Sequence, residues 1–406
     1  MPVAAPSAPT DRYLIISADC HGGGAPDQYR EYLDPKWRDD FDAWRGAYKN
    51  PYRDLRDSDA RTRNWDDARR WKDLEADGQV AEVVFPNTVP PFFPTGIVVA
   101  RPPTNAEYEL RWVGIKAHNR WMADFQSLAP QRRAGIAQVF LNDVDDAVAE
   151  VRWAKEAGLR GGILIPNIPP DHPDIKPIYD PVYDPLWSVC EELDMPVNCH
   201  SGTGLPEYGD YAFTQVLWVI ETPFFAHRPL WFMIMGGVFE RHPELKFVMT
   251  EGGASWVPTT VRQLDGLHMA MQMGSTGEVK FDPATALSKK PSEYFKRNVF
   301  IGCSFPSRSE GAARTKIGLA NYMWGSDYPH FEGSTPFSRE SLRRAFHDVP
   351  AAELHEIFAV TPAHVYGFDL DALAPIAAAV GPTVEEIATP YEGVPKGATS
   401  PCFYQP

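Results

Sequence analysis

Short apolar segments alternate with amphipathic segments along most of this chain, and this alternation limits the fold more than any other feature. Each apolar segment has the length and the β-branched residues of a buried strand, and a segment with helical spacing follows it. Eight such units predict an α/β protein whose parallel strands close into a (β/α)8 TIM barrel. The expected strands are residues 14–19, 80–86, 133–141, 160–165, 196–200, 245–251, 298–303 and 322–327.

Three segments fall outside this alternation. Residues 22–75 are polar, aromatic and rich in arginine, and they are too long for an ordinary loop after the first strand. We expect them to form a lid-like insertion over the site. Residues 371–406 are rich in proline, glycine and alanine, which predicts an extended C-terminal tail that wraps a neighbouring subunit. With residues 1–12 as a disordered lead-in, the barrel domain is expected to occupy residues 13–370.

The composition argues against several classes of partner. The net charge of −15 disfavours nucleic acid and anionic membranes, whose phosphates would be repelled. The five cysteines are scattered and form no CxxC pair, which argues against a zinc ribbon or a disulfide framework and fits a reducing compartment. The N-terminus lacks a signal-peptide core, and the longest apolar stretch, residues 229–239, is too short to cross a bilayer. We therefore expect a cytoplasmic protein that acts on small molecules.

Polar side chains recur where the expected strands end, and in a barrel these ends form the active-site face. The first strand ends in Asp19 and His21, which share one face because side chains alternate along a strand. His200 ends the fifth strand, Glu251 the sixth and Asp327 the eighth. Two imidazoles and three carboxylates are a ligand mixture that suits zinc, manganese or iron. The pattern predicts a divalent metal site formed by these side chains.

Seven short motifs extend from the first expected strand almost to the end of the barrel domain. They occupy residues 17–21, 160–166, 184–187, 196–200, 237–247, 324–330 and 361–368. In content and order they resemble the amidohydrolase-2 family of the amidohydrolase superfamily, which includes aminocarboxymuconate-semialdehyde decarboxylase. The resemblance implies a TIM barrel with a catalytic divalent metal. It matches Asp19 and His21 to the first-strand ligands, His200 to the fifth-strand ligand and Asp327 to the eighth-strand carboxylate.

The chain departs from the pattern of this family in three places. Asp19 stands where the family usually has His or Glu, and this shorter acid still offers an oxygen ligand. Glu251 stands where the decarboxylases of the family have a His after the sixth strand. An ionised glutamate cannot donate a proton, so it either accepts one or binds metal. The fourth strand, residues 162–166, offers no Lys or Glu, so the bridging ligand of two-zinc amidohydrolases is missing.

The first functional hypothesis is a one-metal hydrolase or decarboxylase that acts on a small to medium carboxylate or aromatic substrate. The metal would activate a water molecule or polarise a carbonyl group. Asp327 would be the general base and Glu251 a second acid/base group, with His330 as a further catalytic or substrate contact. Arg308, after the seventh strand, and Tyr328 are the candidate substrate-binding residues, since an arginine can hold a carboxylate through paired hydrogen bonds.

The second hypothesis is a non-haem diiron monooxygenase on the same barrel, which would hydroxylate a large apolar substrate with O2. It makes Glu251 a fifth ligand, because carboxylate-rich sites with a few histidines are typical of dinuclear iron proteins. A third hypothesis is a metal-binding protein without catalysis, although the full ligand set at the catalytic face argues against it. The resemblance and the expected tail also predict a homodimer.

Overall fold

The computed structural model describes residues 11–51, 60–87, 89–97 and 100–405. The expected disordered lead-in falls mainly on residues 1–10, which lie outside the described residues. The first described residues are held by the C-terminal part of the chain, because the backbone nitrogen of Val384 donates to the carbonyl oxygen of Asp11 at 2.8 Å. Among the described residues, no helix combines the length and the apolar character that a membrane crossing needs.

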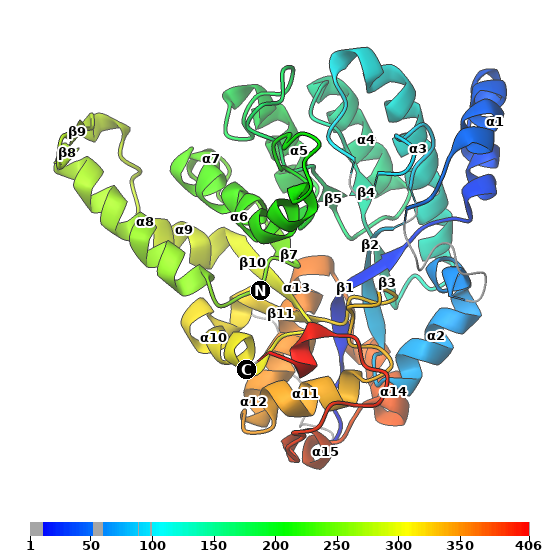
Figure 1. Cartoon of the computed structure of the whole chain (residues 1–406). Coiled ribbons are helices and arrows are strands. Elements are labelled where there is room, and N and C mark those ends of the chain that lie inside the picture. The colour runs from blue at the N-terminus through cyan, green and yellow to red at the C-terminus, as the bar shows by residue number, and fades with distance from the viewer. Residues whose placement is uncertain (1–10, 52–59, 88, 98–99, 406) are drawn as a thin grey trace.

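Parallel strands form the centre of the molecule, and helices surround them (Figure 1). One sheet contains β1 (Ile16–Gly22), β2 (Ala81–Pro86) and β3 (Arg133–Gly135), in that order. The second contains β4 (Ala137–Gln138), β5 (Ile163–Leu164), β6 (Val197–His200), β7 (Phe247–Thr250), β10 (Val299–Ser304) and β11 (Tyr322–Gly325). Each of these strands falls within or overlaps a strand predicted from the sequence.

The two sheets join on both sides into one barrel. On one side only Ile136 separates β3 from β4, and its backbone nitrogen donates to the carbonyl oxygen of Val84 at 3.1 Å. On the other side the backbone nitrogen of His21 donates to the carbonyl oxygen of Tyr328 at 2.6 Å, just beyond the end of β11. Counted with β3 and β4 as one, the strands fill the eight positions of the predicted (β/α)8 barrel and confirm it.

Helices connect these strands around the outside (Figure 1). In chain order they are α3 (Asn105–Ser127), α4 (Val144–Glu156), α5 (Asp184–Glu192), α6 (Thr214–Met235), α7 (Val238–Arg241), α8 (Val257–Gln272), α9 (Pro291–Asn298), α10 (Arg308–Ile317), α11 (Ser338–Phe346), α12 (Ala351–His355) and α13 (Thr361–Tyr366). Local hydrogen bonds determine where several of these helices begin. The Asp143 side chain accepts a hydrogen bond from the backbone nitrogen of Asp146 and caps α4, as N-terminal caps commonly do. The end of α8 and the hairpin of β8 (Ser275–Thr276) and β9 (Val279–Lys280) project from the barrel as an arm (Figure 1).

The core follows the two-residue period of the strands. Ile16 and Ala18 of β1, and Val248 of β7, belong to a buried cluster that fills the inside of the barrel. Their neighbours Ile15 and Phe247 belong instead to the larger cluster between the strands and the helices. Because alternate residues of each strand enter these two layers, the strand ends are fixed in rotation, and so is the direction in which their polar side chains point.

The segment expected to form a lid is largely helical where the structure describes it. It contains a 3-10 segment at Pro26–Tyr32, α1 (Arg38–Ala47) and α2 (Asp67–Ala76), while residues 52–59 lie outside the described residues. The Tyr32 hydroxyl donates to Asp124 of α3 at 2.9 Å, so part of the segment is fastened to the outer helices. That this insertion covers the site stays a prediction.

The C-terminal segment differs from the extended tail that we expected. It begins with α14 (Leu370–Val380) and α15 (Val384–Ala388), and only the part from Thr389 onward is largely without regular structure. Its alanines are strong helix formers, and Leu373 is buried in the cluster that fills the barrel. Arg343 of α11 donates to the carbonyl oxygen of Thr389 at 2.9 Å. These contacts lie within the chain, and the homodimer stays a prediction.

Candidate metal centre

The carboxyl ends of the strands bring four predicted ligands together. The Nε2 atom of His21 lies 3.3 Å from Oδ1 of Asp19 and 3.2 Å from Oδ1 of Asp327. The Nε2 atom of His200 lies 3.6 Å from the same oxygen of Asp19. Asp19 and His21 come from β1, His200 ends β6, and Asp327 follows β11 by two residues. Residues more than 300 positions apart therefore place their donor atoms around one point.

The converging atoms fit a divalent cation. Oδ1 of Asp19, Nε2 of His21, Nε2 of His200 and both carboxylate oxygens of Asp327 are buried, and none makes a hydrogen bond of good geometry within the described residues. Buried polar atoms are normally hydrogen-bonded, so a converging group without such bonds is typical of metal ligands. The second oxygen of Asp19 accepts a hydrogen bond from the Ser304 hydroxyl, which fixes the carboxylate in the way that outer-sphere partners orient ligands.

Glu251 and His330 also belong to the cluster. The Nδ1 atom of His330 lies 2.8 Å from Oδ1 of Asp327, and its Nε2 atom lies 3.0 Å from Oδ1 of Asn87. Oε2 of Glu251 lies 3.4 Å from Nδ1 of His200. Glu251 and Asp327 both have a φ of 59°, a left-handed conformation that non-glycine residues seldom adopt away from functional sites.

Three overlapping groups of ligand atoms can be defined in this cluster, each with its atoms within 4.8 Å of one another. They are Asp19, His21 and His200; His21, Asp327 and His330; and Glu251, Asp327, His330 and Glu332. Glu332 was missed by the sequence analysis. The available signal was its position two residues after His330, in the loop that follows the eighth strand.

Opposite charges alternate across the centre. Burial by itself would raise the pKa of Asp19, but the imidazoles of His200 and His21 outweigh it and hold that pKa well below its usual range. Burial would lower the pKa of His200, but Glu251 and Asp19 raise it to about 9. Burial, with repulsion from Asp327 and Asp19, raises the pKa of Glu251 to about 7. A divalent cation would take over the role of the protons that balance these carboxylates.

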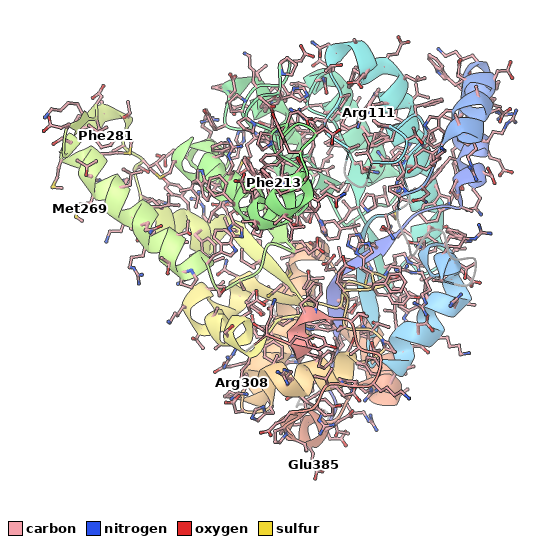
Figure 2. The ribbon with its side chains drawn as sticks, viewed as in Figure 1. Arg111, Phe213, Met269, Phe281, Arg308 and Glu385 are labelled. Carbon is pink, nitrogen blue, oxygen red and sulfur yellow. The ribbon has the colours of Figure 1, made fainter. Side chains whose placement is uncertain are left out.

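The two predicted substrate-binding residues do not face this cluster. Arg308 is the first residue of α10, its side chain is 46% exposed, and Nη2 pairs with Asp348 at 2.7 Å. Figure 2 shows it at the outer edge of the molecule. Tyr328 is buried, and its hydroxyl donates to Asp73 of α2 at 2.9 Å while its ring lies against Arg70. These contacts give neither prediction support, because position after a strand does not fix the direction of a side chain.

A cavity of about 420 Å³ is lined in part by the loop that follows His200, and by none of the side chains of the cluster. Its walls come from the loops after β2, β5 and β6, and from the first halves of α3 and α6. The β6 loop enters the wall at Gly202, two residues after His200, and Asn167 braces this loop by donating to the carbonyl oxygen of His200 at 2.9 Å. This cavity could not be predicted from the sequence, because the residues that line it come from segments that are distant in the chain.

A family model and several solved structures are similar to this chain. The model of a family described as amidohydrolase matches residues 58–368. An amidohydrolase from Mycobacterium avium subsp. paratuberculosis K-10 is similar in structure, with a TM-score of 0.63 and 20% identity over 87% of this chain and 99% of that chain. A 5-carboxyvanillate decarboxylase from Novosphingobium aromaticivorans, complexed with manganese and 4-hydroxy-3-methoxy-5-nitrobenzoic acid, has a TM-score of 0.63 and 20% identity over 88% and 97% of the chains. A 2,6-dihydroxybenzoate decarboxylase from Rhizobium has a TM-score of 0.57 and 17% identity over 89% and 100%.

Proposed function

The chain belongs to the amidohydrolase family and is a metal-dependent enzyme, and from this premise we propose that it decarboxylates an aromatic carboxylate. The observation that carries the proposal is the convergence of buried, unpaired ligand atoms from Asp19, His21, His200 and Asp327. Such a site suits chemistry in which negative charge develops on a bound organic acid. Two of the similar solved structures described above are decarboxylases of substituted benzoates, which favours decarboxylation over hydrolysis.

Asp19, His21, His200 and Asp327 would hold the cation, and we propose manganese as the ion. Mixed carboxylate and imidazole ligands suit Mn, Zn and Fe alike, and the manganese in the similar 5-carboxyvanillate decarboxylase favours the first. The chemistry that the ion supplies when bound is stabilisation of negative charge on the substrate oxygens.

The reaction also needs one proton, which a residue of the chain must supply to the ring carbon. As carbon dioxide leaves, the electron pair of the broken carbon–carbon bond stays on the ring carbon, and a proton takes the place of the carboxylate. We assign that proton to the carboxyl group of Glu251, whose side chain is 21% exposed and can exchange protons with solvent. Asp327 is fully buried between His21 and His330, so it is better suited to binding metal than to exchanging a proton with solvent.

The test is product analysis with manganese-loaded protein and a panel of hydroxylated and methoxylated benzoates. We expect carbon dioxide release and a decarboxylated product from at least one of them, and loss of this activity in Asp327→Asn. A panel of esters and amides serves as the comparison. Hydrolysis of an ester or amide with no release of carbon dioxide would contradict the proposal and favour the hydrolase hypothesis, in which Asp327 acts as the general base on a water molecule.

A second candidate function is the diiron monooxygenase. One observation favours it: Glu251, Asp327, His330 and Glu332 form a further group of ligand atoms, which shares Asp327 and His330 with the group that contains His21. Two adjoining groups could hold two ions. The comparisons give iron no support, so this candidate rests on geometry alone. Two irons per chain after anaerobic loading, with oxygen-dependent hydroxylation of an apolar compound, would favour it over decarboxylation.

A further inference from the structure

The cavity that the β6 loop helps to line has a buried arginine in its wall. Arg111 lies on α3, is only 4% exposed, and lines the cavity of about 420 Å³ together with apolar residues such as Ile97, Leu205 and Trp218. Figure 2 places it among the elements that follow β2, well away from the exposed Arg308. A buried guanidinium is uncommon unless something compensates its charge, so its partners decide its role.

Aromatic rings and one carbonyl group hold Arg111 in place. Its guanidinium carbon lies 4.2 Å from the centre of the Phe93 ring and 5.3 Å from that of Phe140. Its Nη1 atom donates to the carbonyl oxygen of Arg101 at 2.9 Å. These contacts fix the plane of the guanidinium and use one of its nitrogen atoms. Burial lowers the pKa of Arg111 to about 10, so the side chain still carries its charge at neutral pH.

The other edge of the guanidinium has no acceptor. Nε and Nη2 of Arg111 are both buried, and neither makes a hydrogen bond within the described residues. These two atoms form one edge of the guanidinium, and two parallel N–H donors match the two oxygens of a carboxylate. A purely structural arginine would be expected to place these donors on backbone or side-chain oxygens.

The acidic residues of the cavity are engaged elsewhere. Glu107 accepts hydrogen bonds from the backbone nitrogen and the hydroxyl of Thr104 at 2.9 and 2.7 Å, where it completes the cap of α3. Asp171 pairs with Arg101 at 2.5 Å, and Glu207 lies 3.9 Å from the same arginine. None of these carboxylates is within ion-pair distance of Arg111. Glu107, one helical turn before it on α3, raises the pKa of Arg111, but by less than burial lowers it.

We propose that the cavity binds a second carboxylate of the substrate, remote from the reacting one, and that Arg111 receives it through Nε and Nη2. The substrate class is then an aromatic dicarboxylic acid with an apolar body. The inference rests on the proposed function, in which the reacting carboxylate occupies the metal centre, and on the shared β6 loop that links His200 to the cavity wall. Both nitrogens are buried, so the arginine side chain must rotate out of the contacts described above to present them to a carboxylate.

The test is a binding series on the full-length protein. The probes are benzoates that carry, on a para alkyl chain of increasing length, either a second carboxylate or the matching primary amide. Affinities are measured by calorimetry with manganese-loaded and with metal-free wild-type protein, Arg111→Met and Arg111→Lys. Arg308→Met is the matched control, because it removes an exposed arginine away from the cluster.

We expect the acid to bind about 10- to 100-fold more tightly than its amide at the chain length that reaches Arg111, as for a charge-assisted pair. Arg111→Met should abolish this difference, Arg111→Lys should retain part of it, and Arg308→Met should leave it unchanged. Equal affinities of acid and amide for the wild-type protein at every length would overturn the inference, whatever the variants do. So would an acid–amide difference that survives in a folded Arg111→Met protein.

The outcome separates this inference from the proposed function. An Arg111-dependent preference for the acid in protein that releases no carbon dioxide would support the cavity site and reject decarboxylation. Release of carbon dioxide from simple benzoates, with no preference for a second carboxylate, would support decarboxylation and reject the cavity site. The metal-free measurement adds a further check, because the cavity lies outside the ligand cluster and its preference for the acid should persist without the ion.

Discussion

The backbone nitrogen of Asp327 donates a hydrogen bond of 2.8 Å to the carbonyl oxygen of Asp19. This bond joins the end of the last barrel strand to the end of the first, beside the bond from His21 to Tyr328. The closure of the barrel and the placement of two of the proposed ligand carboxylates are therefore coupled. The side chain of His21 then lies between both carboxylates. The geometry of the centre is therefore a direct product of the fold, and it can be tested by changes in the strands themselves.

Gly325 tests this link between closure and metal binding. It is the last residue of β11, and a Cβ atom there would lie 2.5 Å from Cβ of Asp19. Gly325→Ala should force β11 away from β1, lower the melting temperature and weaken manganese binding by at least about tenfold, as misplaced ligand supports do. Calorimetric titration with manganese measures the effect. Gly266→Ala is the control, since nothing lies within 4 Å of a Cβ in that part of α8. Wild-type manganese affinity in a folded Gly325→Ala protein would contradict this link.

Glu251→Gln separates the two roles that this glutamate can have. Glutamine keeps the size of the side chain but cannot deliver a proton as a carboxylic acid does. If Glu251 is the proton donor, turnover should fall by about 10²- to 10⁴-fold while the metal content stays the same. Elemental analysis and single-turnover kinetics on the same preparation give both values. Loss of one ion with loss of activity would instead identify Glu251 as a ligand and support the two-metal candidate.

His118 predicts a pH dependence of stability far from the metal centre. Its ring is buried on α3 between Tyr29 and Trp121, and burial lowers the pKa of His118 to about 3. In the unfolded chain the pKa of His118 is about 6.5. Between about pH 3 and about pH 6.5, His118 is therefore protonated in the unfolded state but neutral in the folded state. The free energy of unfolding should therefore fall by about 1.4 kcal/mol for each pH unit below about 6.5 on account of this residue.

The comparison that isolates this contribution is His118→Leu. Urea unfolding of both proteins at pH 7 and pH 5 should show a smaller loss of stability for the variant, because the leucine cannot be protonated. The difference between the two pH values, rather than the stability at either one, is the quantity to compare. An identical loss for variant and wild type would show that His118 does not contribute.

The sequence predicted the parts of the molecule that depend on local pattern. The apolar runs gave the strands, because a buried parallel strand needs little besides apolar, β-branched residues. The strand ends indicated the residues that converge in the candidate metal centre, because Asp19 and His21 alternate onto one face and the barrel brings the other ends to the same rim. The alternation of side chains along a strand and the common rim of the barrel therefore predict the same cluster of residues.

What the sequence could not predict depends on the rotation of individual side chains and on distant loops. Arg308 follows a strand as the ligands do, but it begins a helix whose surface faces solvent. Tyr328 is adjacent to Asp327, and the turn carries its ring under α2. Arg111 gave no signal because its proposed role depends on its contacts with Phe93 and Phe140, which only the folded chain brings together. Alanines in α14 were mistaken for part of an extended tail.

The most direct test of the metal centre is the manganese content of wild-type and His200→Ala protein, measured by elemental analysis after reloading and removal of free ion. His200 contributes one of the buried, unpaired atoms around the common point, and the fold around it is held by other contacts. We predict about one ion per chain in the wild type and almost none in the variant, with both proteins folded. Full manganese content in folded His200→Ala protein would contradict the assignment of the centre.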